Sequence, residues 1–414
     1  MFLASLSSSL ALADEEVPRL SKSVMVPVPA HGMPRNITEE EKEFWKQPDN
    51  GVYRPCLEFG IEYRRASAKI SKEKRRFLIV VVSGGLNQQR NQIVDAVVIA
   101  RILEAALVIP VLKVNFIWGD ERQSIEGKIP HDVTPQWIHT KFFKQLNEEG
   151  VLVLKGLDSK LLKNLPSDLQ KLRCKVAFHA LRFSGPIREV GDKLARRMWI
   201  EGPYIGLHLR LEKDVWLRTG CRTGLGPKFD SVIAEERKSN PEFLTGRLNM
   251  TYDQRRLAGL CPAQEVARLL KALGAPRSAR LFAAGGVPLG GSEALQPLKE
   301  EFPDLVTKEI LAKEGELAPY VNRSSALAAI DYIISLSSDV FMPSHGGNTG
   351  RVMQGHRAYI GHRKYIKPNK RAMLPFFEDP SILEPEFEKV MRRLHKDSLA
   401  PPELRDNKRG RDAI

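Results

Sequence analysis

Residues 77–90 read Phe-Leu-Ile-Val-Val-Val-Ser-Gly-Gly-Leu-Asn-Gln-Gln-Arg, and this stretch decides the fold class. Its continuous apolar run, 77–82, is typical of a strand that is buried on both faces of a sheet. After the Gly84-Gly85 turn the apolar residues recur at helical spacing, and a second apolar run at 106–109 predicts another strand. Strand, turn, helix and strand form a βαβ unit, which predicts a parallel sheet covered by helices.

The second half of the chain repeats this α/β pattern. Residues 204–211 alternate, so that His208 and Arg210 share one face of a strand while Ile205 and three leucines take the other. Two polar side chains on one face of a strand indicate a site at its end. Further elements are predicted at 279–284 (strand), 324–337 (helix) and 340–342 (strand).

The length of 414 residues exceeds the size at which a single hydrophobic core stops growing, so we expect two domains. Prolines interrupt the first 71 residues, which therefore read as an irregular stem or arm. The polar and basic tail after Pro401 is expected to be disordered. The expected parts are residues 1–71 (arm), 72–200 (first α/β domain), 201–375 (second α/β domain) and 376–414 (C-terminal helix and basic tail).

The net charge of +14 suits an anionic partner: nucleic acid, acidic lipid, acidic polysaccharide or a nucleotide diphosphate. The lysines and arginines are spread along the chain without interleaved aromatic residues, so nucleic acid is not expected. Neither Asp-x-Asp nor His-Glu-x-x-His occurs, so no metal site is expected. The apolar start, residues 2–13, is too short to span a bilayer and no basic residue precedes it, so it offers no clear signal or anchor.

Three segments could carry chemistry. The Gly84-Gly85 turn precedes a helix, whose free N–H groups can bind phosphate, although such turns are also ordinary α/β connections. Arg210 is a candidate bidentate phosphate ligand, with a structural salt bridge as the alternative. Residues 344–351, Ser-His-Gly-Gly-Asn-Thr-Gly-Arg, form a second glycine turn before a predicted helix. Two such turns and the His-x-Arg strand together favour a nucleotide cleft.

Residues 84–90 (GGLNQQR), 206–210 (GLHLR) and 343–348 (PSHGGN) resemble the plant protein O-fucosyltransferase family, over a match from Arg76 to Leu374. The resemblance implies a GT-B architecture, in which two Rossmann-like domains with parallel sheets face each other across a cleft and the second binds the donor. It also implies inverting transfer from a GDP-sugar to a protein or glycan acceptor, with no metal or other cofactor. The family would place the protein in the Golgi lumen and associate it with a membrane.

Site residues carry over from the family by position. Arg210 would hold the β-phosphate of the leaving GDP and, with His208, form the catalytic pair. Asp331 lies where animal relatives have a guanine-binding aspartate. The donor-binding residues expected from the resemblance are Gly84, Gly85, Leu86, Asn87, Arg90, His208, Leu209, Arg210, Asp331, Ser344, His345, Asn348, Thr349 and Arg351.

This sequence also departs from the family. Gly84 stands where one animal branch has a glutamate base, so no general base is assigned. Asp120 is joined directly to the region of Arg122, and a segment found in relatives is missing. In a secretory lumen we expect Cys221 to form a disulfide with Cys261. A rhamnosyl or mannan-related cell-wall transferase, and a sugar-nucleotide-binding protein without activity, remain as alternatives.

Overall fold

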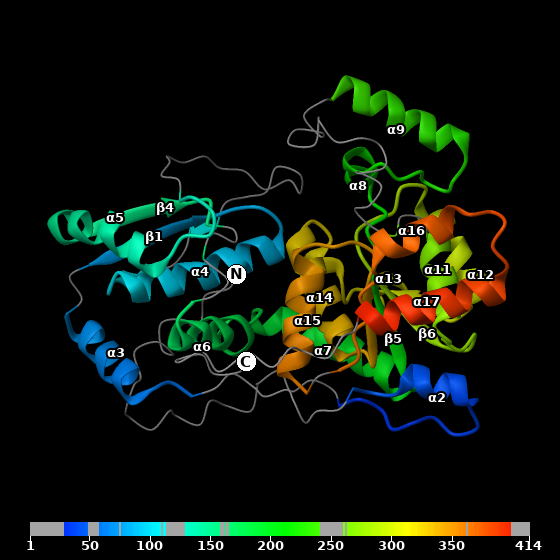
Figure 1. The fold of residues 1–414 in the computed structure, drawn as a ribbon, viewed down its shortest axis with the longest axis horizontal. Helices are drawn as coiled ribbons and strands as arrows, with labels where there is room; N and C mark the ends of the chain where they lie inside the picture. Colours follow the sequence, from blue (N-terminus) through cyan, green and yellow to red (C-terminus); the bar gives the residue numbers. More distant parts are fainter. Residues whose placement is uncertain are drawn as a thin grey trace. The chain divides into compact units, whose positions relative to one another are not determined.

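The structure is a computed structural model, and it divides the chain into two compact units. Unit 1 contains the described residues of 53–186, and unit 2 contains those of 27–52 and 187–402. Each unit carries one sheet of parallel strands with helices packed around it (Figure 1), which confirms the predicted α/β class with two Rossmann-like domains. The structure describes residues 29–48, 58–73, 76–108, 111–112, 129–157, 161, 165–240, 260, 263–361 and 363–398.

Unit 1 is built around β1 (Phe77–Val82), which is the continuous apolar run of the sequence. β4 pairs in parallel along residues 77–81 of this strand, β2 pairs with its first two residues and β3 with its last two. From Leu78 onward β1 is largely buried, and the following helix α4 (Leu86–Ile102) buries most of its side chains too, as a doubly covered parallel strand requires. The other elements of unit 1 are α3 (Ile61–Glu73), β2 (Ala106–Leu107), β3 (Val111–Leu112), α5 (Pro135–Glu149), β4 (Val151–Lys155), α6 (Ser167–Lys175) and the π-helical turn η3 (Val176–Ala180).

Unit 2 contains a four-stranded parallel sheet in the order β7-β6-β5-β8. The chain moves outward from β5 through β6 to β7 and then returns to the other side of β5 to form β8. Strand order therefore reverses between β5 and β8, and ligands of open α/β sheets bind outside the carboxyl ends of the strands at such a point. The strands are β5 (Tyr204–His208), β6 (Arg280–Ala284), β7 (Leu305–Thr307) and β8 (Val340–Pro343).

The two faces of this sheet are covered by different helices. Ile205, Leu207, Leu209 and Leu211 all belong to one hydrophobic core with α11 (Ala263–Ala272), α16 (Lys370–Glu378) and α17 (Glu384–Ser398), which confirms the alternation predicted for this strand. On the opposite face Tyr204 donates a hydrogen bond to Ile334 of α14 (Ser324–Ser337) at 2.7 Å. The remaining helices of unit 2 are α2 (Glu39–Trp45), α7 (Gly185–Ile200), α8 (Lys213–Arg218), α9 (Pro227–Ser239), α12 (Gln296–Glu301), α13 (Lys308–Leu311), α15 (Asn348–Tyr359) and the 3₁₀ turns η5 (Gly291–Leu295) and η6 (Ala318–Tyr320).

The boundary between the units differs from the expected one. Helix α7 was expected to end the first domain, but all of it after Pro186 belongs to unit 2. A Cβ on Gly191 would lie 2.6 Å from Ile333 of α14, so the absence of a side chain lets α7 pack closely against α14. This packing, which the sequence pattern alone does not reveal, moves the boundary toward the N-terminus.

Two helices lie within the first 71 residues, where an irregular arm was expected, and the expectation is wrong for these segments. Helix α2 begins with a capping box, in which the backbone N–H of Thr38 and that of Glu41 each donate to the other residue's side-chain oxygen. The helix buries Phe44 and Trp45 in the core of unit 2. Helix α3 belongs to unit 1 and places Tyr63 against the core of that unit. Frequent prolines concealed a capping signal that the sequence does contain.

Cys221 and Cys174 are both disulfide-bonded, and the described part of the chain contains no free cysteine. Cys261 lies outside the described residues, so its pairing with Cys221 stays a prediction. The junction from Asp120 to Arg122 and the tail after Pro401 also lie outside them. Across the described helices, none combines the length and apolar character needed to cross a membrane.

Candidate functional site

The first glycine turn caps its own helix in unit 1. Gly84 adopts φ 90°, a left-handed conformation that favours glycine, and a Cβ there would lie 2.5 Å from Oε1 of Gln88. That oxygen accepts the N–H of Gly85 at 2.9 Å. The predicted strand, turn and helix are confirmed, whereas phosphate binding by the turn stays a prediction.

Two polar residues after this turn point into unit 1. Arg90 is 3% exposed, donates a hydrogen bond from Nη2 to the carbonyl oxygen of Ala177 at 3.1 Å, and stacks over the ring of Phe183. Asn87, like the apolar Leu86, is buried on the same helix. These contacts give Arg90 a structural role, and its expected role as a donor ligand stays a prediction.

The second group of expected residues lies together at the carboxyl edge of the unit 2 sheet, where strand order reverses. His208 ends β5 and pairs with Pro343 at the end of β8. Beyond this pair, the N–H of Ser344 donates to the carbonyl oxygen of His208 at 3.0 Å, and the N–H of Arg210 donates to Oγ of Ser344 at 3.3 Å. The His-x-Arg motif and the Pro-Ser-His motif are therefore joined by two direct hydrogen bonds.

The side chain of Arg210 is fixed by two carboxylates of its own unit. Nε donates to Oε2 of Glu212 at 3.0 Å, and Nη2 donates to Oδ2 of Asp214 at 3.2 Å. Both bonds use the same edge of the planar guanidinium, the one that carries the Nε–H. The outer edge, formed by Nη1 and the second N–H of Nη2, keeps the two-pronged geometry that binds phosphate.

Glu212 also contacts the turn that follows β6. Its Oε1 accepts the N–H of Gly286 at 2.9 Å, so both carboxylate oxygens are engaged. Burial by itself raises the pKa of Glu212, but the guanidinium of Arg210 and the N–H of Gly286 outweigh it and bring the pKa below its ordinary value. Glu212 is therefore a fixed anion at neutral pH.

His208 is a neutral imidazole at neutral pH. Burial, reinforced by the positive charge of Arg210, lowers the pKa of His208 to about 4. Its Nδ1 is buried, and within the described residues that atom has no hydrogen-bond partner. A neutral ring can donate or accept a hydrogen bond, but it neither supplies positive charge to a phosphate nor acts as a strong base.

The hydrogen bonds around Ser344 connect Arg210 to His345. Oγ of Ser344 accepts from the N–H of Arg210 at 3.3 Å and lies 3.0 Å from Nδ1 of His345. A hydroxyl group has one proton and two lone pairs, so it can donate to an unprotonated Nδ1 or accept from a protonated one. In either case the contact holds the imidazole of His345 in the second glycine turn.

This second turn is shorter than predicted: α15 begins at Asn348, so Asn348, Thr349 and Arg351 lie in the first turn of the helix and not in the turn before it. A helix of this length offers free N–H groups at its start. A lysine lies beside the turn: a Cβ on Gly346 would be 3.3 Å from Nζ of Lys370. Burial lowers the pKa of Lys370 to about 8, so it remains a cation at neutral pH.

Asp331, on α14, is bound to the turn after β6. Its Oδ2 accepts from Nζ of Lys308 at 3.0 Å and from the N–H of Gly285 at 3.3 Å, and Lys308 also donates to the carbonyl oxygen of Gly285 at 2.9 Å. Burial raises the pKa of Asp331 to about 7. Burial lowers the pKa of Lys308, but the carboxylates of Asp331 and Glu309 raise it more, so the lysine stays charged.

Sequence reasoning missed four charged residues of this edge. Glu212 and Asp214 follow Arg210 by two and four residues, and this spacing beside an arginine was a usable signal. Lys308 and Lys370 are brought to the site only by tertiary packing, from the start of α13 and the start of α16. No local pattern marks either lysine.

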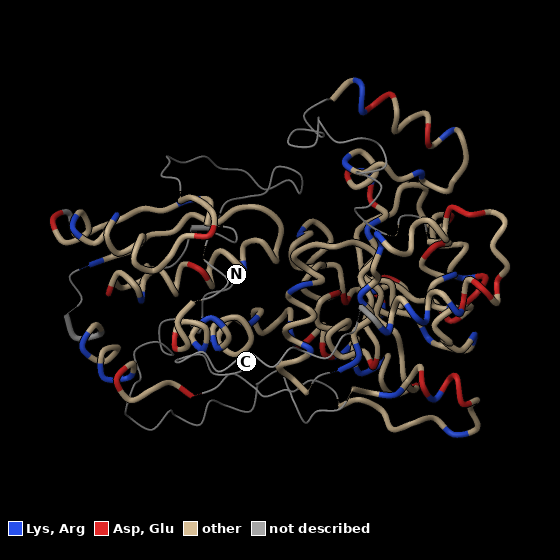
Figure 2. The backbone as a smooth tube through the Cα atoms, viewed as in Figure 1, with Lys and Arg blue, Asp and Glu red and all other residues tan. Residues whose placement is uncertain are grey.

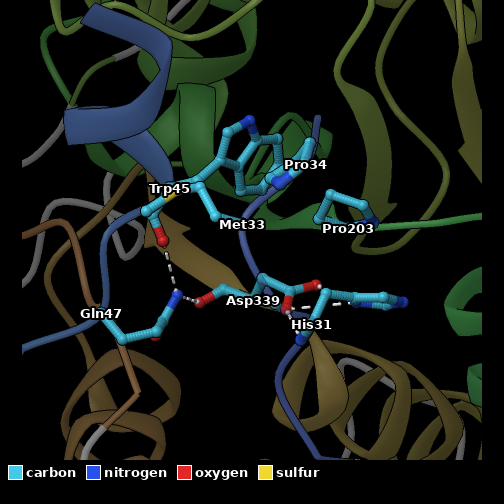
Figure 3. A pocket seen from close by; sticks show the side chains of 8 residues that line it. His31, Met33, Pro34, Trp45, Gln47, Pro203 and Asp339 are labelled. Carbon is cyan, nitrogen blue, oxygen red and sulfur yellow. Dashed lines mark hydrogen bonds and ion pairs between the residues drawn. The ribbon is translucent and has the colours of Figure 1, made fainter. Parts of the chain in front are cut away.

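A separate cavity of about 200 Å³ lies at the opposite, amino-terminal edge of the same sheet. Figure 3 shows His31 against Asp339, with Trp45 and Gln47 contributed by the segment that contains α2. Nδ1 of His31 lies 3.1 Å from Oδ2 of Asp339, and Nε2 lies 2.7 Å from the carbonyl oxygen of Trp199. The backbone N–H of His31 also donates to Oδ1 of Asp339 at 2.8 Å, so these contacts attach the N-terminal segment to unit 2.

Charge and metal-ligand patterns add little to this site. Figure 2 shows Lys and Arg interspersed with Asp and Glu over the described elements. In the described parts of the chain, no three His, Cys, Asp or Glu side chains gather closely enough to hold a metal ion. The exclusion of nucleic acid and the expectation of a metal-free site both stay predictions.

Comparisons with known proteins agree with the motifs. O-fucosyltransferase 37 of Arabidopsis thaliana is 63% identical over 428 residues, covering 95% of this chain and 77% of the relative. O-fucosyltransferase 24 of the same plant is 55% identical, covering 90% of this chain and 71% of the relative. A solved structure of POFUT1 in complex with GDP is similar at 15% identity and a TM-score of 0.39, covering 70% of this chain and 98% of that one.

The alignment with the first relative is longer than the 414 residues of this chain, so that relative carries residues which this chain lacks. The family description "GDP-fucose protein O-fucosyltransferase" matches residues 77–130 and 122–360. The two matches overlap at residues 122–130, beside the junction from Asp120 to Arg122, where a missing segment is predicted. On this family match and on both relatives, the chain belongs to the GDP-fucose protein O-fucosyltransferase family.

Proposed function

We propose that this protein transfers fucose from GDP-fucose to a hydroxyl group of a protein or glycan, with inversion at the anomeric carbon and without a metal ion. The family assignment supports glycosyl transfer, and the chain covers more than two thirds of the relatives that carry the O-fucosyltransferase name. The single observation that favours a working site is the fixed guanidinium of Arg210 at the point where strand order reverses.

Arg210 supplies the charge for departure of the nucleotide. The bond between the anomeric carbon and the β-phosphate oxygen breaks, its electron pair goes to GDP, and the outer edge of the guanidinium stabilises the growing negative charge. Lys370 adds a second cation beside the glycine turn that precedes α15. Two cations of the protein then serve the role that a divalent ion has in other transferases.

Asp331 would bind the guanine base. Its Oδ2 is occupied by Lys308 and Gly285, whereas the buried Oδ1 has no hydrogen-bond partner among the described residues. A carboxylate oxygen can accept the adjacent N–H groups of guanine. Because one carboxylate oxygen has partners within the protein and the other has none among the described residues, the second can accept from a base. This difference supports the role carried over from the family.

Neither His208 nor Glu212 is suited to act as a general base. The pKa of His208 is lowered to about 4, and that of Glu212 is also below its ordinary value. We therefore infer that the acceptor oxygen forms its bond to carbon while still carrying its proton, which is released to solvent afterwards. Such a sequence requires an oxocarbenium-like transition state that depends on leaving-group stabilisation.

The test incubates the purified protein with GDP-fucose, GDP-mannose or UDP-rhamnose, with plant protein and glycan acceptors, and follows nucleotide release. Release from GDP-fucose alone supports the proposal, and release from UDP-rhamnose or GDP-mannose indicates the cell-wall alternatives. GDP binding without turnover on any donor indicates a non-catalytic protein. A chelator should leave GDP affinity unchanged, and loss of binding that magnesium restores would contradict a metal-free site.

We place the reaction in the lumen of the secretory pathway, in the Golgi. The disulfide bonds of Cys174 and Cys221 support an oxidising compartment, because such bonds are rare in the cytosol. Membrane association is carried over from the family alone. Fractionation of plant cells, with protease protection of a tagged protein, tests the placement: digestion without detergent would contradict it.

A further inference from the structure

Glu212 connects Arg210 to the turn that follows β6. One carboxylate oxygen accepts from Nε of Arg210 at 3.0 Å, and the other accepts from the N–H of Gly286 at 2.9 Å. The side chain is only 15% exposed, so these bonds form in a largely dry environment where they orient their donors firmly. Arg210 is thus attached to the turn after β6 as well as to its own strand.

Close packing fixes the turn that Glu212 contacts. A Cβ on Gly285 would lie 2.5 Å from the carbonyl oxygen of Leu209, and a Cβ on Gly286 would lie 3.0 Å from Cγ of Glu212. Only glycine allows the turn to approach β5 and Glu212 so closely. Glu212 therefore contacts the turn both by close packing and by its hydrogen bond to the N–H of Gly286.

The same turn is held from its other side by Lys308 and Asp331. Lys308 donates to the carbonyl oxygen of Gly285, and Asp331 accepts the N–H of that residue. The residue expected at the phosphate end of the donor and the one expected at its base end are consequently connected through two consecutive glycines. A displacement of the turn would move both.

The orientation of the guanidinium is the quantity that Glu212 controls. With Nε and Nη2 engaged by Glu212 and Asp214, the outer edge projects away from both carboxylates. No described residue bonds to Nη1 of Arg210, so the bidentate face is available to a ligand. Without Glu212, rotation about the long side chain would let that face turn toward Asp214 instead.

We propose that Glu212 is a positioning residue that orients Arg210 for the donor diphosphate and locks it to the Gly285–Gly286 turn. The inference rests on the proposed use of GDP-fucose as donor. A role as general base is disfavoured, because both oxygens of Glu212 accept hydrogen bonds and its pKa is lowered rather than raised. Glu212 acts through Arg210, and its effect must disappear when Arg210 is absent.

A double-mutant cycle tests this dependence. GDP affinity is measured by calorimetry, and kcat and KM for GDP-fucose by GDP release, for wild type, Glu212→Gln, Arg210→Ala and the double variant. Glu212→Gln should weaken GDP binding and lower kcat/KM by about tenfold each, as expected for lost hydrogen bonds to a charged group. In the Arg210→Ala background the same substitution should cost less than about twofold, because the interacting partner is gone.

Two controls separate positioning from stability and from base catalysis. Glu316→Gln removes a carboxylate that is likewise paired with an arginine of unit 2, Arg197, and should change neither affinity nor kcat. Where Glu212→Gln lowers Tm by more than a few degrees, Asp214→Asn is added to the cycle, since it changes the second bond to Arg210 and, besides that, a 3.9 Å ion pair with Arg218. The acidic limb of the pH–rate profile should be the same in wild type and Glu212→Gln.

Additive losses in the cycle, or a Glu212→Gln enzyme whose kcat alone falls while the acidic limb vanishes, would overturn the positioning role. Failure of the proposed function has a different signature. A wild-type protein that binds no GDP, or that binds it but turns over another donor, contradicts the donor assignment before any variant is compared.

Discussion

The backbone N–H of Arg210 lies 3.3 Å from Oγ of Ser344, so two sequence motifs separated by more than a hundred residues meet in one hydrogen bond. Ser344 is 1% exposed, and the same hydroxyl lies 3.0 Å from Nδ1 of His345. A single buried oxygen thus contacts both the backbone of Arg210 and the imidazole of the neighbouring histidine.

Replacing Ser344 by alanine should remove both contacts. The buried N–H of Arg210 loses its acceptor, which should lower the free energy of unfolding by about 1–3 kcal/mol. Misplacement of Arg210 and His345 should lower kcat/KM for GDP-fucose by about tenfold or more. Urea unfolding and initial-rate kinetics measure the two losses. Ser381→Ala, which removes an exposed hydroxyl of unit 2, should change neither, and equal activity in both variants would contradict the role of Ser344.

Arg210→Ala should reduce turnover far more than stability. Loss of one donor to a developing anion typically costs about 10²-fold or more in kcat. Because the guanidinium is 31% exposed and its carboxylate partners belong to the same unit, the accompanying loss of stability should be about 1 kcal/mol. Arg210→Lys should not restore full activity, since an ammonium lacks the planar two-point contact. A variant that melts early but keeps its rate per folded molecule would show a purely structural arginine.

Because the pKa of Lys370 is lowered, we expect donor binding to depend on pH. Its pKa is lowered to about 8 by burial, so the cation is present below that pH and is lost as the pH rises through it. The KM for GDP-fucose should rise between about pH 7 and pH 9, and Lys370→Met should raise it about tenfold at pH 7 and flatten the profile. Lys370→Arg, which stays charged, should keep a low KM at pH 9. Lys389→Met, on the exposed side of α17, serves as control, and an identical profile in Lys370→Arg and wild type would refute this explanation.

Because the pKa of His395, on α17, is lowered, we expect the protein to lose stability in acid. Burial, assisted by the charge of Lys364, lowers the pKa of His395 to about 4 from an ordinary 6.5. Between these two values the unfolded chain binds the proton and the folded chain does not, so stability is complete above about pH 6.5 and is lost as the pH falls toward 4. From pH 7 to pH 5 the wild type should lose about 2 kcal/mol more than His395→Gln. Urea unfolding at both values measures the difference, and parallel losses in the two proteins would contradict it.

The sequence was most informative where structure follows from local periodicity. The alternation from Tyr204 to Leu211 was confirmed because a period of two places Leu209 and Leu211 in the core and leaves Arg210 on the other face. The glycine turns were confirmed as turns between strand and helix, since Gly84 adopts a positive φ and Gly347 precedes α15.

Features that depend on distant packing were not predictable. Lys308, at the start of α13, bonds to Asp331 on α14, and Lys370, at the start of α16, lies beside Gly346. No local sequence pattern indicates either contact. Helix α2 was missed although Thr38 and Glu41 form a capping box, because frequent prolines outweighed the signal. The motifs thus located the site, and tertiary structure supplied the charges that hold it.

The attachment of α2 has a practical consequence for shortening this protein. Reading residues 1–71 as a dispensable stem suggests removing them to obtain a compact catalytic fragment. That cut would take Phe44 and Trp45 out of the core of unit 2 and would remove the imidazole that faces the buried carboxylate of Asp339. A shortened protein that keeps Pro29 and everything after it retains these contacts, so the safe point of truncation lies before the segment, not after it.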